Sequence, residues 1–209
     1  PFRKKPLAEL VTSGLRRHNI VHMSKRQATT KIIAGTFKGT KIPFKPSKLL
    51  RPTENKTKET LFNWLLNDLN KKICLDMFAG TGSLGIEAIS RGAEFVLFVE
   101  KDKRLCSNIE SIIKKLNVDE NCKIINSNSL SLDYSNLPNK FDLIFIDPPF
   151  NENLINKSLE AVIKKNLLSQ NGVVYIECEK SFSLNSEMYG LRKIKESRGG
   201  EVKFYLYEG

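Results

Sequence analysis

The sequence predicts an α/β fold in which helices cover both faces of a mostly parallel sheet. From about residue 72 onward, short apolar runs alternate with longer stretches whose apolar residues recur at helical spacing. This alternation is typical of parallel sheets, because a helix usually forms the crossover between parallel strands. A glycine-rich turn joins the first strand to the first helix of the series, and Asp-Pro-Pro-Phe follows a later strand.

The pattern predicts strands and helices in alternating order. The expected strands span residues 73–78, 95–100, 123–126, 143–147, 173–177 and 202–207. The expected helices span residues 83–91, 103–116 and 154–168. The final stretch differs, because two strand-like runs flank Gly199-Gly200 and predict an antiparallel hairpin at the end of the chain.

Two smaller parts precede a main domain that we expect over residues 51–209. Residues 1–30 form a basic arm that we expect to lack regular structure. In residues 31–50, Gly and Pro interrupt short apolar runs, which predicts a small β-hairpin appendage. The main domain opens with the helical run KETLFNWLLNDL, and Trp64 is expected in the core. Four apolar residues of this run share the face expected to pack on the sheet: Leu61, Trp64, Leu65 and Leu69.

The composition is globular, with a strong excess of positive charge. Hydrophobic residues make up 40% of the 209 residues, and no apolar run approaches the roughly 18 residues that a membrane span needs. The formal net charge is +11, and more than half of it lies before residue 32. Such a surplus favours a nucleic acid as the partner, although a Lys-rich proteome would also produce it.

The basic arm fits three interpretations. It is a disordered segment that grips phosphates, an organellar transit peptide, or sequence upstream of the true start, for which Met23 would be an initiator. An apolar stretch of the kind found in secretory signals is missing, so we do not expect secretion.

The cysteines and histidines do not predict a metal site. His18 and His22 are two isolated ligands, and no cysteine pair has the C-x-x-C spacing. The four cysteines lie far apart: Cys74, Cys106, Cys122 and Cys178. Free thiols fit a reducing cytoplasm, and we expect a cytoplasmic monomer without a metal ion.

The glycine-rich turn indicates a nucleoside cofactor. The segment ICLDMFAGTGSLGIEAISRGA contains Gly80-x-Gly82-x-x-Gly85 between a strand and a helix. Glycines let the backbone approach a ligand, and the helix N-terminus presents free N–H groups to it. Glu100 ends the next strand, where a carboxylate can accept hydrogen bonds from ribose hydroxyls.

Asp76 favours one cofactor among those that the glycine spacing allows. NAD, FAD and S-adenosylmethionine all present a ribose to the second strand, so the spacing alone leaves them open. An acidic group at the end of the first strand suits an ammonium and a sulfonium better than a pyrophosphate. Asp76, four residues before Gly80, therefore favours S-adenosylmethionine.

The segment Asp147-Pro148-Pro149-Phe150 predicts chemistry on an aromatic amine. It ends a buried strand at the edge where open α/β sheets bind ligands. Prolines lack N–H donors, so their carbonyl oxygens remain as acceptors beside the Asp147 carboxylate. These acceptors can hold both hydrogens of an exocyclic amine and direct its lone pair at a methyl donor. Phe150 can stack on the base, a contact worth about 1–3 kcal/mol.

These motifs together resemble the bacterial small-subunit ribosomal RNA methyltransferase D family. The resemblance runs from about Lys31 to the C-terminus and leaves out the basic arm. The similar segments are KIIAGTFKGTKIPF, LRPTENKTKETLFNWL, LDMFAGTGSLGIEAISRGA, the strand-end Glu100 and IDPPF. Many amino-methyltransferases share the glycine turn and Asp-Pro-Pro-Phe, whereas LRPT followed by KETLFNWL points to this family.

The resemblance implies a Rossmann-like S-adenosylmethionine-dependent methyltransferase fold, with a seven-stranded sheet and an N-terminal β appendage that contacts RNA. It implies methyl transfer to the N2 amine of a guanine in 16S ribosomal RNA, the family target being guanine 966, with 16S ribosomal RNA or an assembling small subunit as the partner. Arg51, Thr53 and Phe150 are then expected near the target base. Asn128 stands where family members usually carry an acid that holds the adenine amine. The expected cofactor contacts are Asp76, Phe78, Gly80, Gly82, Glu100 and Asn128.

Other functions fit parts of the sequence. An amino-methyltransferase acting on adenine or on a protein glutamine would share Asp-Pro-Pro-Phe. The positive net charge argues against a protein substrate. The absence of a separate target-recognition domain argues against a sequence-reading DNA enzyme. An NAD-dependent oxidoreductase would leave that segment unexplained and would need a His or Tyr near the strand ends, whereas both histidines lie in the arm. A non-catalytic RNA-binding or assembly factor would not need intact motifs.

Overall fold

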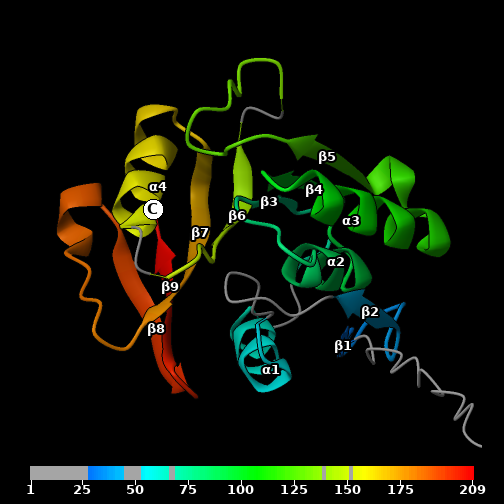
Figure 1. The fold of residues 1–209 in the computed structure, drawn as a ribbon. Coiled ribbons are helices and arrows are strands. Elements are labelled where there is room, and N and C mark those ends of the chain that lie inside the picture. The colour runs from blue at the N-terminus through cyan, green and yellow to red at the C-terminus, as the bar shows by residue number, and fades with distance from the viewer. Residues whose placement is uncertain (1–27, 45–52, 66–68, 138–139, 151–152) are drawn as a thin grey trace, which may run out of the picture.

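A computed structural model describes residues 28–44, 53–65, 69–137, 140–150 and 153–209. Among these residues a seven-stranded sheet forms the centre, in the order β5-β4-β3-β6-β7-β9-β8 (Figure 1). Strands β3 to β7 pair in parallel, and β9 pairs antiparallel with β7 and β8. The strands are β3 (Ile73–Asp76), β4 (Phe95–Glu100), β5 (Cys122–Asn126), β6 (Phe141–Ile146), β7 (Leu168–Glu179), β8 (Arg192–Gly199) and β9 (Val202–Glu208). The predicted mostly parallel sheet with a C-terminal antiparallel hairpin is confirmed.

Helices pack on both faces of this sheet. Side chains alternate between the faces along each strand: in β4, Phe98 belongs to one core cluster and Leu97 to the other. The first cluster lies under α1 (Asn55–Trp64), α2 (Ser83–Ser90) and α3 (Lys103–Leu116), and the second lies under α4 (Leu154–Lys164). Both faces of the central strands are therefore covered, which explains their continuous apolar sequences.

The sequence prediction was wrong at the end of α4. The expected helix reached residue 168, whereas α4 ends at Lys164 and β7 already begins at Leu168. Asn166 between them has a left-handed backbone with φ of 52°, which ends the helical path. The run of apolar residues there is compatible with either structure, and pairing of Leu168 with Phe141 of β6 decides for the strand.

The helix α1 buries a slightly different face from the expected one. Leu61 is fully buried as predicted, but Phe62 beside it is buried too. Trp64 ends the helix and packs on the core, with its ring 5.2 Å from that of Phe204, so the predicted core position of Trp64 is confirmed. Leu65 caps the helix and Leu69 lies beyond it.

The N-terminal appendage is a two-stranded antiparallel hairpin beside α2 (Figure 1). Its strands are β1 (Ala28–Lys31) and β2 (Lys41–Phe44). The first strand therefore begins three residues inside the range that we expected for the basic arm. The rest of the arm lies outside the described residues, as do residues 45–50 of the range expected for the appendage.

Candidate active site

Three acidic side chains meet at one edge of the sheet. Because β4, β3 and β6 are parallel neighbours, their carboxyl ends lie together. Asp76 is the last residue of β3, Glu100 is the last of β4, and Asp147 directly follows β6. The negative charges of Asp147 and Glu100 both raise the pKa of Asp76. The sequence prediction that these carboxylates share one site is consistent with this geometry.

Asp76 is an almost completely buried carboxyl group. Burial is the main cause that raises its pKa to about 7, followed by the charge of Asp147. Its Oδ2 accepts a hydrogen bond from the Gly85 backbone N–H at 3.2 Å, which acts in the opposite direction. The ionised form is costly without a positive partner, so this site favours a cationic ligand.

The glycine turn has the geometry that its sequence requires. Gly80 and Gly82 have left-handed backbones, with φ of 53° and 76°. A Cβ at Gly85 would lie 2.2 Å from the ring of Phe98, so only glycine lets α2 approach β4 this closely. The turn therefore brings backbone N–H groups to the carboxyl edge of the sheet.

Glu100 holds this turn in place. Its Oε2 accepts a hydrogen bond from the Gly80 N–H at 2.8 Å, and its Oε1 accepts one from the Asp102 N–H at 2.8 Å. A carboxylate offers about four acceptor positions, so these two bonds leave capacity for the hydroxyls of a ribose.

The side chain of Asn128 hydrogen-bonds to the backbone of its own turn. This side chain is exposed, and its Oδ1 accepts a hydrogen bond from the Leu130 N–H at 3.0 Å. This leaves one lone pair of that oxygen for an amine. Phe78 is half-buried and packs against the core under α4.

Two serines that the sequence did not single out are candidates for ligand contacts. Ser83 opens α2, and Ser129 follows Asn128. Both hydroxyl groups are buried and lack a hydrogen-bond partner in the described part of the chain. A buried polar group without a partner costs about 1–3 kcal/mol, which a polar ligand would offset. Serine is too common in turns for either position to be recognised from one sequence.

Asp147 is anchored by a residue far away in the sequence. Its Oδ2 accepts a hydrogen bond from the Thr53 hydroxyl at 3.1 Å. Burial raises the pKa of Asp147 to about 7, and the Thr53 hydrogen bond opposes this shift. Thr53, expected near the target base, therefore lies at the site, whereas Arg51 lies outside the described residues.

The rest of the Asp-Pro-Pro-Phe segment follows Asp147 directly. Pro148 is buried, and Pro149 and Phe150 are partly exposed. Phe150 also packs against the core under α1 and α2. The segment is thus supported from one side and accessible from the other.

In the described ranges no helix is long and apolar enough to cross a bilayer. The same ranges contain no group of three or more His, Cys, Asp or Glu side chains that could hold a metal ion.

Several known proteins are similar to this chain over most of its length. The family model described as conserved hypothetical protein 95 matches residues 30–208. The ribosomal RNA small subunit methyltransferase D of Haemophilus influenzae is 40% identical over 85% of this chain and 93% of its own length. The Escherichia coli protein of that name is 32% identical over 85% of this chain and 89% of its own. The solved structure of the Escherichia coli methyltransferase yhhF has a TM-score of 0.73 at 30% identity, covering 87% of this chain and 98% of that one. The chain therefore belongs to the ribosomal RNA small subunit methyltransferase D family.

Proposed function

We propose that this protein is an S-adenosylmethionine-dependent ribosomal RNA methyltransferase that acts on the N2 amine of a guanine in 16S ribosomal RNA. The observation that carries the proposal is the Asp147 carboxylate, which Thr53 holds at the carboxyl edge beside Asp76. The substrate class is supported by the names of the relatives in Haemophilus influenzae and Escherichia coli.

The residues at the sheet edge fit the cofactor. When bound, S-adenosylmethionine supplies an electrophilic methyl group on a sulfonium. Asp76 would face its positive groups, since a buried carboxyl with a pKa raised to about 7 is stabilised in its ionised form by a nearby cation. Glu100 would accept from the ribose, and the unpartnered hydroxyls of Ser83 and Ser129 fit a ligand with several polar atoms. Asn128 keeps one lone pair for the adenine amine.

The amine would be held by Asp147 and the carbonyl groups that follow it. A guanine N2 lone pair is delocalised into the ring, so the amine is a poor nucleophile. Acceptors on both of its hydrogens favour a more pyramidal nitrogen, and the remaining catalysis is proximity and orientation. The proton would leave once the methyl group has been transferred, and Asp147 would take it up. Phe150 would stack on the base.

The finer details of the proposal concern the substrate particle. The family resemblance implies guanine 966 as the target, in 16S ribosomal RNA or in an assembling small subunit, and the protein would act as a cytoplasmic monomer. A base in folded RNA must be accessible or flipped out for this chemistry. Arg51 would lie near the target base, and the basic arm would contact the phosphates around it.

The test is transfer of labelled methyl from S-adenosylmethionine to small-subunit particles from cells that lack this activity. Nucleoside analysis of the RNA should give N2-methylguanosine confined to the small-subunit RNA. Methyladenosine would keep the amine chemistry and overturn the guanine assignment. Label only in DNA or protein would overturn the ribosomal substrate.

A further inference from the structure

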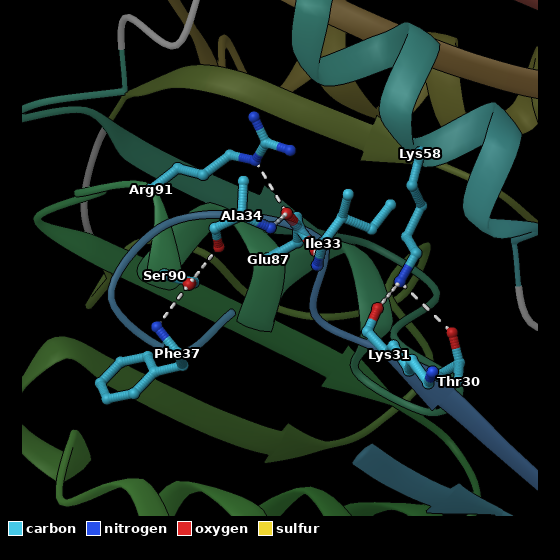
Figure 2. A network of polar contacts seen from close by, with 9 residues as sticks. All are labelled: Thr30, Lys31, Ile33, Ala34, Phe37, Lys58, Glu87, Ser90 and Arg91. Carbon is cyan, nitrogen blue, oxygen red and sulfur yellow. Dashed lines mark hydrogen bonds and ion pairs between the residues drawn. The ribbon is translucent and has the colours of Figure 1, made fainter. Parts of the chain in front are cut away.

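A buried carboxylate of α2 holds the backbone of the appendage. Glu87 is fully buried, and its Oε2 accepts a hydrogen bond from the Ile33 N–H at 2.7 Å (Figure 2). Its Oε1 accepts one from the Ala34 N–H at 3.0 Å. These two amides lie two and three residues beyond the end of β1, so a single side chain fixes the turn of the hairpin against α2.

Neighbouring groups complete this contact. Arg91 donates from Nε to Glu87 at 2.8 Å and lies over the ring of Phe62 in α1. Ser90 donates to the Ala34 carbonyl at 2.6 Å and accepts from the Phe37 N–H at 3.0 Å. The Glu87 carboxylate is therefore charge-paired and accepts from three donors, which a buried charge requires.

A buried lysine holds the same hairpin from α1. Lys58 is fully buried and donates from Nζ to the Lys31 carbonyl at 2.6 Å and to the Thr30 hydroxyl at 3.3 Å (Figure 2). Burial lowers the pKa of Lys58 to about 8, and the charge of Glu87 opposes this shift. An apolar side chain at position 58 would leave the Lys31 carbonyl and the Thr30 hydroxyl without this donor, so Lys58 fixes the direction of the hairpin as well as filling space.

The two helices that hold the appendage also carry the active site. The N-terminus of α2 follows the glycine turn, and α1 begins two residues after Thr53, which donates to Asp147. The outer face of the appendage presents Lys31 and Lys41 directly opposite each other, both exposed. Like charges at opposed strand positions are destabilising, and a phosphate placed near them would relieve this.

We propose that Glu87 and Lys58 are positioning residues: they fix the appendage in one orientation, so that RNA bound on its outer face presents the target base to Asp147. This inference rests on the proposed function. The appendage is then a rigid part of the catalytic unit, although α1 and α2, the helices that hold it, are far from Asp147 in the sequence.

The test compares Glu87→Gln with Glu110→Gln, which makes the same change of charge at an exposed position of α3. Glu87→Gln should lower kcat on the small-subunit particle by about tenfold to a hundredfold, because a misplacement of about 1 Å can cost that much. The Kd values for RNA and S-adenosylmethionine should change little. Lys58→Met should behave in the same way, and Glu110→Gln should match the wild type.

Amide hydrogen exchange provides a readout that needs no activity. In Glu87→Gln the amides of Ile33 and Ala34 should exchange faster, while those of β3 and β4 stay protected. Unchanged kcat, or a loss of kcat accompanied by an equal loss of S-adenosylmethionine affinity, would overturn the positioning role. The proposed function and the positioning role fail in different measurements. A wrong guanine assignment would show in the methylated nucleoside that the wild-type protein makes. A wrong positioning role would show in the kcat of the variant relative to that of the wild type.

Discussion

Buried carboxylates serve two different purposes in two regions of this molecule. Where the appendage meets α2, Glu87 accepts hydrogen bonds from two backbone amides and from Arg91. At the carboxyl edge of the sheet, burial raises the pKa of Asp76 and of Asp147 to about 7. The first carboxylate uses its hydrogen-bonding capacity inside the protein, whereas the other two keep capacity for a ligand.

The hydrogen-bond partners of these carboxylates separate structural charge from reactive charge. A buried carboxylate with several donors and a cation beside it rigidifies the protein around it. Carboxyl groups that burial holds near neutral pKa, at a sheet edge beside a glycine turn, are poised to change their charge when a ligand arrives. Burial alone does not distinguish the two cases, but the partners of each carboxylate do.

The largest effect is expected at Asp147. Asp147→Ala removes the proposed acceptor for the target amine, so methyl transfer should fall by about 10²–10³-fold or more. The affinity for S-adenosylmethionine should change little, as calorimetric titration would measure. An equal loss of transfer and of cofactor binding would show that Asp147 belongs to the cofactor site rather than to the amine site.

A smaller effect is expected for the pH dependence of cofactor binding. The pKa of Asp76 is raised to about 7 in the free protein, and a bound cation would lower it. Binding then releases a proton, so affinity should rise with pH below about 7, by up to about tenfold per unit. Asp76→Asn should flatten this slope in titrations between about pH 5 and 8. The same slope in both proteins would assign the titration to another group.

Rising pH should increase the affinity for the cofactor, but it should decrease the stability of the free protein. A carboxyl pKa raised in the folded state means that folding is favoured by protonation. The contribution of Asp76 to the free energy of unfolding is therefore fully present below about pH 4 and is lost as the pH rises through about 7. When the free energy of unfolding is measured with urea, Asp76→Asn should therefore lack the part of the decrease between about pH 4 and 7 that comes from Asp76.

The smallest effect is expected at Thr53. Thr53→Val removes the hydrogen bond that lowers the pKa of Asp147, so the acidic limb of the kcat profile should move to higher pH. The shift should be about one to two pH units, since a hydrogen bond to a charged group is worth about 1.5–3 kcal/mol and one pKa unit corresponds to about 1.4 kcal/mol. Thr53→Ser keeps the hydroxyl and should restore the wild-type profile. A uniform loss of kcat at every pH would make Thr53 a packing residue.

The sheet and the position of the site could be predicted from the sequence. The strand and helix signals are local, and the carboxyl ends of neighbouring parallel strands share an edge in any such fold. For this reason Asp76, Glu100 and Asp147 could be assigned to one site before their geometry was known. The predicted end of α4 was wrong, since an apolar run around Leu168 fits a helix or a strand until its partner strand is known.

Local spacing in the sequence predicts most of the helices and strands, the glycine turn and the acidic residues at the strand ends. Which distant groups come into contact depends on the tertiary structure. Thr53 and Asp147 lie 94 positions apart, and Ile33 and Glu87 lie 54 apart. Lys58 and Glu87 are charged residues in helices, which usually face solvent, yet both are buried where the appendage docks on α1 and α2. Such burial depends on how elements pack, and no local pattern specifies it.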